Sequence, residues 1–332
     1  MYKKNVVVTG GAGFIGSHLI DQLVESGHSV TVIDNFSTGR PENIAHQQGR
    51  VRIIEVDITN FDAIFPHFKD QDIVFHLAAL ADIVPSIVEP RAYYLSNVLG
   101  TMNVVEAARL AKIQKLIYAA SSSCYGIPPK EFYPTSEIAP INPQHPYALT
   151  KYLGEQTALR WGQIYDLSVT SLRFFNVYGP RSKTSGTYEV VFGTFLAQKL
   201  VHKPFTIVGD GNQTRDFIYV TDVANAMIAA SFSQVKNEIF NVGTGTPQSI
   251  NTLASLLDGE KIHIPKRPGE PDCTWADIRK IKTILHWKPE ISFSEGVQKI
   301  LQHINYWKEA PVWTPDRIEK ATEDWFKYLA RN

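Results

Sequence analysis

Short apolar runs alternate with longer segments of mixed polarity over the first half of the chain. The apolar runs are rich in β-branched residues and lie at 5–9, 29–33, 51–55, 73–76, 115–119 and 168–172. Runs of this length and composition are typical of buried parallel strands. Helix-length segments lie between and beside them, at 15–26, 97–111 and 148–165. The alternation predicts an α/β fold of the doubly wound Rossmann type, with helices on both faces of a parallel sheet.

This rhythm breaks up after residue 175. Proline and glycine interrupt the chain repeatedly there, at Pro204, Gly209, Gly211, Pro247, Pro265, Pro268 and Pro271. We expect a smaller, mixed α/β lobe over the carboxyl edge of the sheet, where ligands of open α/β folds bind. The predicted division is a first domain over 1–175, rejoined by about 216–242, and a second lobe from 176–215 and 243–306.

The last segment, 307–332, is expected to be a helical extension. After Trp307 it carries aromatic residues that call for an explanation, namely Trp313, Trp325, Phe326 and Tyr328. Aromatic side chains at such positions either pack on the body of the protein as a cap or form a partner surface. The sequence leaves both readings open.

The charge balance narrows the range of partners. The 332 residues include 33 basic and 33 acidic side chains, so the formal net charge is zero. No electrostatic argument therefore favours nucleic acid or an anionic membrane, and no apolar stretch is long enough for a membrane span. The two cysteines, Cys124 and Cys273, cannot form a disulfide framework, which favours a reducing cytoplasm. No metal site is predicted.

A glycine-rich turn connects the first predicted strand to the first predicted helix. It reads Thr-Gly-Gly-Ala-Gly-Phe-Ile-Gly over residues 9–16. Gly10 permits the tight turn, Gly13 lets the backbone approach a pyrophosphate, and Gly16 allows close helix–strand packing. The helix begins at about Phe14 and presents free N–H groups to the anion. The spacing and its context predict a dinucleotide site.

Acidic and apolar residues at the next strand ends extend this site. Asp34 lies 18 residues beyond Gly16, where a carboxylate accepts hydrogen bonds from a ribose diol and repels a 2′-phosphate. We therefore predict NAD as the cofactor, although Arg40 nearby could favour NADP. Asp57 and Ile58 would lie by the adenine. Residues 76–79 would line the cleft, with His76 as a structural residue.

A serine, a tyrosine and a lysine supply the candidate chemistry. Tyr147 and Lys151 lie four residues apart at the start of a predicted helix and share one face of it. A tyrosine with its usual pKa of about 10 is a poor base at neutral pH. A neighbouring ammonium and a positively charged nicotinamide would favour the phenolate, which could then take a hydroxyl proton. Ser121, at the end of the fifth strand, could assist that transfer.

Together these residues resemble the extended short-chain dehydrogenase/reductase family, and in particular its nucleotide-sugar epimerase/dehydratase branch. The resemblance covers about residues 5–287 and rests on ordered motifs at 9–16, 34–39, 76–79, 97–101, 121–126, 147–151, 173–179, 215–220 and 267–277. It implies an NAD-dependent enzyme acting on a nucleotide-linked sugar, most closely a 4-epimerase of UDP-hexoses or UDP-N-acetylhexosamines. It also implies a homodimer and a setting in polysaccharide biosynthesis.

The resemblance assigns residues to each part of the site. The catalytic set is Ser121, Tyr147 and Lys151. The cofactor contacts are Gly10, Gly13, Phe14, Ile15, Gly16, Asp34, Asn35, Phe36, Ser37, Thr38, Gly39, Asp57, Ile58, Leu77, Ala78, Ala79, Asn97, Tyr147, Lys151, Phe174 and Val177. The substrate contacts are Ser121, Ser122, Ser123, Tyr147, Asn176, Val190, Arg215, Arg267, Glu270 and Thr274.

Two details separate the reactions of the branch. Its 4,6-dehydratases carry an Asp-Glu pair directly after the catalytic serine, and its decarboxylases keep the glutamate. This chain has Ser122 and Ser123 there, which favours epimerisation over the alternatives, a 4,6-dehydratase or a 4-dehydrogenase or decarboxylase. Thr274 is small, at a position that borders the C2 substituent in hexose 4-epimerases, so an N-acetyl group is expected to fit. A non-catalytic dinucleotide-binding regulator would not need the intact Ser121, Tyr147 and Lys151.

Overall fold

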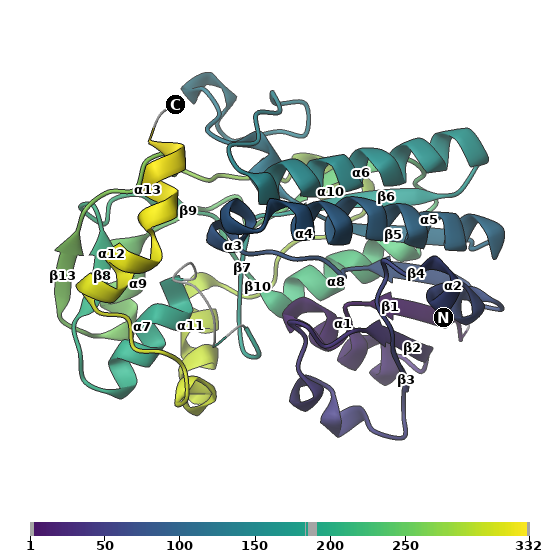
Figure 1. Ribbon diagram of the computed structural model, residues 1–332, viewed down its shortest axis with the longest axis horizontal. Coiled ribbons are helices and arrows are strands. Elements are labelled where there is room, and N and C mark those ends of the chain that lie inside the picture. The colour runs from purple at the N-terminus through teal and green to yellow at the C-terminus, as the bar shows by residue number, and fades with distance from the viewer. Residues whose placement is uncertain (1–2, 183, 185–190, 331–332) are drawn as a thin grey trace.

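The computed structural model describes residues 3–182, 184 and 191–330. Its centre is a sheet of seven parallel strands in the order β11-β6-β5-β4-β1-β2-β3 (Figure 1). The strands are β1 (Asn5–Thr9), β2 (Ser29–Asp34), β3 (Arg52–Glu55), β4 (Ile73–His76), β5 (Lys115–Ser121), β6 (Val169–Phe174) and β11 (Glu238–Val242). The predicted doubly wound α/β fold is confirmed, and the strand order places a topological switch between β1 and β4.

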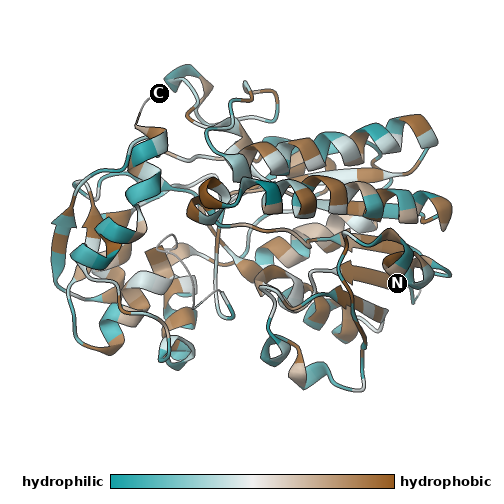
Figure 2. Cartoon of the chain, viewed as in Figure 1, coloured by the Kyte–Doolittle hydropathy of each residue, from teal (hydrophilic) through white to brown (hydrophobic). Residues whose placement is uncertain are grey.

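The apolar runs form strands because both faces of the sheet are buried. Val6 and Val8 point into one core, Val7 points into the other, and all three are 0% exposed. The first core lies under α1 (Phe14–Glu25), α8 (Val220–Ser231) and α10 (Arg279–Ile284). The second lies under α2 (Phe61–Ile64), α5 (Thr101–Leu110) and α6 (Pro146–Tyr165). Figure 2 shows the apolar strands between these amphipathic helices.

The helical segment before β5 is longer than the predicted 97–111. It begins with α3 (Ile83–Val88) and α4 (Pro90–Tyr94), and a π-helical turn over Leu95–Gly100 leads into α5. The π turn buries Asn97 completely. Its amide accepts the Leu80 N–H at 2.8 Å and donates to the Leu80 carbonyl at 3.0 Å. The wider turn therefore secures the loop that follows β4, a role that a regular helical period does not predict.

The second lobe is built from short paired strands and helices. The pairs are β7 (Asn176–Tyr178) with β10 (Phe217–Tyr219), β8 (Phe205–Val208) with β13 (Lys261–Ile264), and β9 (Thr214–Arg215) with β12 (Gln248–Ser249). The helices are α7 (Val191–Leu200), α9 (Ile250–Leu257) and α11 (Phe293–Gln302). They enclose a third core, rich in aromatic side chains, that includes Phe192, Phe205 and Trp307. The chain crosses back to the large sheet through α8 and β11.

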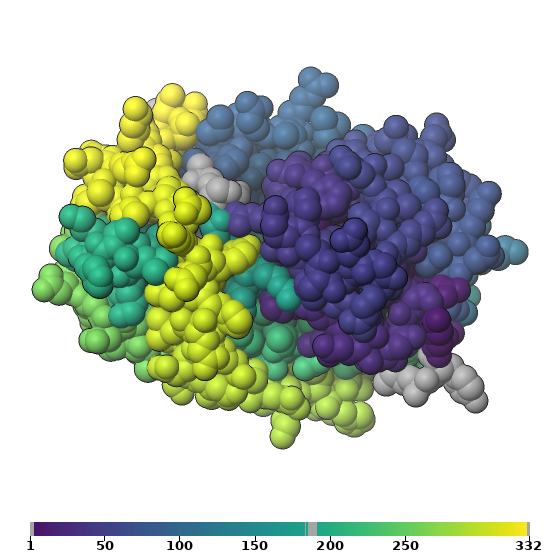
Figure 3. All heavy atoms as spheres, turned by 90° about the horizontal axis from the view of Figure 1, so that it is seen from below, coloured from purple at the N-terminus to yellow at the C-terminus, as the bar shows by residue number. Residues whose placement is uncertain are grey.

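Two short helices end the described chain, α12 (Pro315–Ala321) and α13 (Glu323–Leu329). The C-terminal residues form a continuous band along the outside of the smaller lobe (Figure 3, yellow). Of their aromatic side chains, Trp325 is 4% exposed whereas Tyr328 is 53% exposed. The extension is therefore packed through some of its aromatic residues and leaves others on the surface. No helix of the described residues is long and apolar enough to cross a membrane.

Candidate active site

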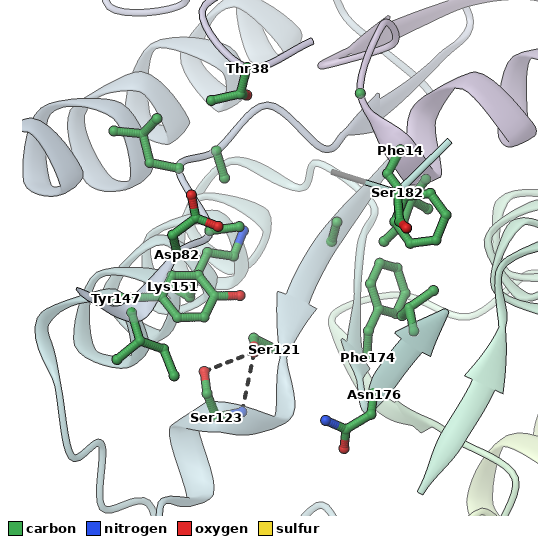
Figure 4. A pocket seen from close by; sticks show the side chains of 18 of the residues that line it. Phe14, Thr38, Asp82, Ser121, Ser123, Tyr147, Lys151, Phe174, Asn176 and Ser182 are labelled. Carbon is green, nitrogen blue, oxygen red and sulfur yellow. Dashed lines mark hydrogen bonds between the residues drawn. The ribbon is translucent and has the colours of Figure 1, made fainter. Parts of the chain in front are cut away.

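A cavity of about 640 Å³ lies where the two lobes meet, at the carboxyl ends of the central strands (Figure 4). Most of the predicted site residues line it: Gly10, Gly13, Phe14, Ile15, Gly16, Asp34, Asn35, Ser37, Thr38, Gly39, Asp57, Ile58, Leu77, Ala78, Ala79, Ser121, Ser122, Ser123, Tyr147, Lys151, Phe174, Asn176, Val177, Arg215, Arg267, Glu270 and Thr274. Residues from distant parts of the sequence thus meet in one space.

Two of the predicted contact residues do not line the cavity, and a third is not described. Asn97 does not line the cavity, because its amide is buried and bonded to Leu80 and Thr150. Phe36 does not line it either. Its side chain packs against the first core, and its backbone N–H donates to Asp34. Both residues support the cavity wall from behind. Val190 lies outside the described residues.

The glycine turn is shaped as a dinucleotide cradle. Gly10 has a φ of +70°, and a Cβ there would lie 2.6 Å from the backbone nitrogen of Ala78. A Cβ on Gly16 would lie 2.3 Å from the Gly10 carbonyl oxygen. Gly13 precedes the first turn of α1, whose N–H groups favour an anion. The close approaches explain Gly10 and Gly16, and the turn as a whole fits the pyrophosphate of NAD.

Asp34 ends β2 beside this cradle and is 7% exposed. Its carboxylate accepts the backbone N–H groups of Ala12 and Phe36, each at 2.9 Å. Burial raises the pKa of this carboxyl, and the two N–H groups oppose the rise. The carboxylate is thereby fixed at the cavity wall, where it can accept further hydrogen bonds from a ribose diol.

His76 is a satisfied structural residue, as predicted. Its ring nitrogens lie 2.7 Å from the Thr9 hydroxyl and 3.0 Å from the Thr101 hydroxyl. Burial lowers its pKa to about 3, so the imidazole is neutral. The ring therefore links β1, β4 and α5 just below the cradle.

Ser121, Tyr147 and Lys151 face the same part of the cavity (Figure 4). Ser121 ends β5, and its hydroxyl lies 2.8 Å from the Ser123 hydroxyl and accepts the Ser123 N–H. Tyr147 is the second residue of α6, after Pro146 at the first helical position. Lys151 follows one turn later on the same helix. The strand end and the helix start thus bring a hydroxyl, a phenol and an amine together.

The environment of Lys151 is apolar and aromatic. Its Nζ lies 4.6 Å from the centre of the Tyr118 ring, and the residue is 6% exposed. Burial lowers its pKa to about 7, and Glu155 opposes the shift. An amine with this pKa gains and loses its proton near neutral pH, where the Tyr147 phenol is also expected to exchange a proton.

Glu155 anchors the same helix to the sheet. It pairs with Arg173 at 2.6 Å and accepts the Ser171 hydroxyl at 2.6 Å. The guanidinium of Arg173 also donates to the Tyr125 hydroxyl, which donates to Asn241. This buried network joins α6, β6 and β11 directly beneath the reacting groups, so it holds them in one geometry.

His145 is a site residue that the sequence reasoning missed. It caps α6 by accepting the Ala148 N–H at 3.2 Å, and its ring stacks on Tyr147 with centroids 5.8 Å apart and an angle of 9°. Burial lowers its pKa to about 4, so it stays neutral. His145 and Asp82 both line the cavity. The only signal for His145 was its place before Pro146, which marks a helix start.

The second lobe closes the far end of the cavity with charged and polar side chains. Glu270 lies between two arginines, 2.8 Å from Arg215 and 3.1 Å from Arg267. Near them, the Thr274 hydroxyl donates to Asn176 Oδ1 at 2.8 Å and accepts the Asp216 N–H at 3.0 Å. No cluster of metal-ligating side chains occurs in the part of the chain that the structure describes.

The sheet, the cradle and the Ser-Tyr-Lys set define an enzyme of the extended short-chain dehydrogenase class. The chain belongs to the NAD dependent epimerase/dehydratase family, whose model matches residues 6–243. The predicted family, the fold class and NAD as the cofactor are thereby confirmed.

Individual relatives extend over most of the chain. The UDP-glucose 4-epimerase of Mycolicibacterium smegmatis is 36% identical over 307 residues, which are 89% of this chain and 97% of that protein. The UDP-N-acetylglucosamine 4-epimerase of Methanobrevibacter ruminantium, solved with UDP-N-acetylmuramic acid, superposes with a TM-score of 0.86 and 35% identity over 92% and 98% of the two chains. The UDP-glucuronic acid 4-epimerase of Bacillus cereus, solved with UDP-glucuronic acid and NAD, gives 0.83 and 34% over 91% and 99%.

Proposed function

We propose that this protein is an NAD-dependent 4-epimerase that interconverts UDP-hexoses or UDP-N-acetylhexosamines. The observation that carries the proposal is the meeting of three parts in one cavity. Ser121, Tyr147 and Lys151 line the same cavity as the glycine cradle and the arginine pair of the second lobe. A nucleotide sugar with its diphosphate at the arginines would extend its sugar toward Tyr147. The relatives that are named as UDP-sugar 4-epimerases support the same reaction.

Each of the three reacting residues has a distinct task. Tyr147 takes the proton of the sugar O4 as its C4–H bond breaks, and returns a proton after the 4-keto sugar has presented its other face. Ser121 hydrogen-bonds the reacting oxygen and helps the proton to move. Lys151, through its ammonium form, favours the phenolate of Tyr147. Bound NAD supplies a hydride acceptor and donor that ends the cycle unchanged.

The residues after Ser121 favour epimerisation over elimination. Ser122 and Ser123 line the cavity where a dehydratase needs an acid and a base. The hydroxyl of Ser123 lies 2.8 Å from that of Ser121, so it orients the serine rather than removing a carbon-bound proton. A 4,6-dehydratase or a decarboxylase is the second candidate, and the accumulation of a keto sugar or NADH would distinguish it.

The second lobe supplies the substrate contacts of the proposal. Arg215 and Arg267 suit a diphosphate because a guanidinium binds phosphate oxygens through two parallel donors. Glu270 holds the two guanidinium groups beside each other and can accept a ribose hydroxyl. Thr274 and Asn176 form the wall beside the sugar, and the small threonine leaves space for a C2 acetamido group.

The proposal also assigns a function to each domain. Residues 1–175 with 216–242 bind NAD, residues 176–215 and 243–306 bind the sugar nucleotide, and 307–332 form the extension. A homodimer through α4–α6 is supported by exposed apolar side chains on these helices, namely Tyr94, Leu95, Leu110, Leu149, Ile164 and Tyr165. A cytoplasmic location and a role in polysaccharide biosynthesis stay predictions.

Incubation with a panel of UDP-, GDP- and dTDP-sugars, followed by NMR at C4, tests the function. We expect interconversion of gluco and galacto epimers for UDP-sugars without added reductant. A product that lacks oxygen at C6, a released carboxyl carbon or stoichiometric NADH would contradict the proposal.

A further inference from the structure

The C-terminal helix α13 touches both lobes at the mouth of the cavity. On the side of the sheet domain, Trp325 and Leu329 form a small apolar cluster with Val84 of α3. On the side of the second lobe, Leu329 lies against Gly269, where a Cβ would be 3.7 Å from the Leu329 Cβ. The extension therefore joins α3 to the loop 267–270 (Figure 1).

Trp325 is the residue through which α13 reaches the cavity. Its indole N–H donates to the Pro268 carbonyl at 2.7 Å. Its ring lies 5.0 Å from the guanidinium carbon of Arg267. The side chain is 4% exposed and lines the cavity together with Arg267 and Glu270. A residue of the extension is thus part of the wall at the arginine end.

These contacts fix the position of one of the two arginines. Arg267 is held by Glu270 at 3.1 Å on one side and by the indole face on the other, and its side chain is 10% exposed. A guanidinium that lies over an aromatic face directs its N–H donors within its own plane, away from the ring. Pre-orientation of this kind lowers the entropy that binding must overcome.

We propose that Trp325 is a positioning residue for substrate binding: it orients Arg267 toward the diphosphate of the nucleotide sugar, so the C-terminal extension completes the substrate site. The inference rests on the proposed function for the identity of the anion. It assigns a specific role to the C-terminal extension, whose packed aromatic residues a capping role alone would also explain. Because Trp325 acts through Arg267 and not through the reacting groups, it should act on binding and leave the chemical step unchanged.

Two substitutions separate the aromatic contact from simple packing. Trp325→Phe keeps an aromatic face over Arg267, whereas Trp325→Leu keeps an apolar contact with Val84 but loses that face. Tyr328→Ala, on the exposed side of the same helix, is the matched control. If the leucine variant does not fold, Trp325→Met replaces it. All are prepared as the full chain loaded with NAD.

The readouts are the Kd of UDP by calorimetry and the KM and kcat for UDP-N-acetylglucosamine. Trp325→Leu should raise Kd and KM about tenfold, the scale of a desolvated cation–π contact, with kcat within about threefold. Trp325→Phe and Tyr328→Ala should stay within about threefold of the parent in all three. In an Arg267→Ala background the leucine substitution should have almost no further effect, because the two residues act as a unit.

Three results would overturn the inference. They are unchanged UDP affinity in Trp325→Leu, equal losses in the leucine and phenylalanine variants, and additive losses in the double variant. Each of them leaves epimerisation by the parent intact, so the proposed function would stand. A parent that neither binds UDP nor interconverts C4 epimers would instead overturn both.

Discussion

Replacing Thr274 by tyrosine should lower kcat/KM for N-acetylated sugars. The threonine hydroxyl bridges Asn176 and the backbone N–H of Asp216 at 2.8 and 3.0 Å, and the residue lines the cavity. A tyrosine would extend into the space proposed for the C2 substituent. An overpacked side chain typically costs about 1–3 kcal/mol, which is roughly a tenfold to hundredfold loss in kcat/KM for the acetylated sugar. Plain hexoses have no group there to clash.

A valine at the same position isolates the steric effect. Thr274→Val has nearly the same shape but loses both hydrogen bonds and leaves the N–H of Asp216, a residue that is 0% exposed, without its acceptor. That loss costs about 1–3 kcal/mol of stability, and it should affect both sugars equally. The two variants therefore share the hydrogen-bond loss and differ in bulk.

The assay is kcat/KM of the parent and both variants on UDP-N-acetylglucosamine and UDP-glucose. We divide kcat/KM for UDP-N-acetylglucosamine by kcat/KM for UDP-glucose. This ratio should stay constant in Thr274→Val and fall at least about tenfold in Thr274→Tyr. Equal losses on both sugars in the tyrosine variant would refute the reasoning, because Thr274 would then support the wall without selecting the substrate.

Three further predictions concern the reaction, the cofactor and stability. Tyr147→Phe should lower kcat by at least roughly a hundredfold with fold and NAD content retained; turnover within about tenfold of the parent would remove its assigned role. Asp34→Asn keeps an oxygen acceptor and removes the charge, so a cofactor titration should show a smaller preference for NAD over NADP. Equal binding of both cofactors by the parent would contradict the role given to Asp34. Burial lowers the pKa of His18, His76 and His145 to about 4, 3 and 4. The unfolded chain therefore binds more protons below pH 6.5, and the free energy of unfolding should fall as the pH drops from 6.5 toward 4. Urea titrations should show a shallower fall in His76→Asn, and parallel curves would disprove the linkage.

The sheet could be predicted because its signals are local. Val6, Val7 and Val8 are apolar in succession and lie directly before a glycine turn, and that pattern is typical of a strand that is buried on both faces. The glycine turn was equally informative, since Gly10 and Gly16 are required by contacts with neighbouring backbone. Tyr147 and Lys151 share a helix face by spacing alone. The seven-stranded order itself depends on pairings that no local pattern encodes.

The residues that the sequence did not reveal act through contacts that residue type alone does not predict. His145 is defined by a ring stacked on Tyr147 and a single capping bond, and its residue type alone does not predict either contact. Trp325 belongs to the last helix and is far from Arg267 in the sequence, yet its ring contacts the guanidinium of that residue. The family resemblance assigned Asn97 to the cofactor site, and the structure shows its amide bonded to Leu80, 17 residues away. The positions of Trp325 and Asn97 depend on tertiary packing.

In the proposed reaction C4 is oxidised and reduced within one cavity, with Tyr147 exchanging the proton. The most direct test is epimerisation of a UDP-sugar that carries deuterium at C4, followed by NMR and mass spectrometry of both epimers. We expect deuterium to remain at C4 in the gluco and galacto forms, in ordinary water and without added cofactor beyond what the protein holds. Loss of deuterium to solvent, or its appearance in released NADH, would contradict it.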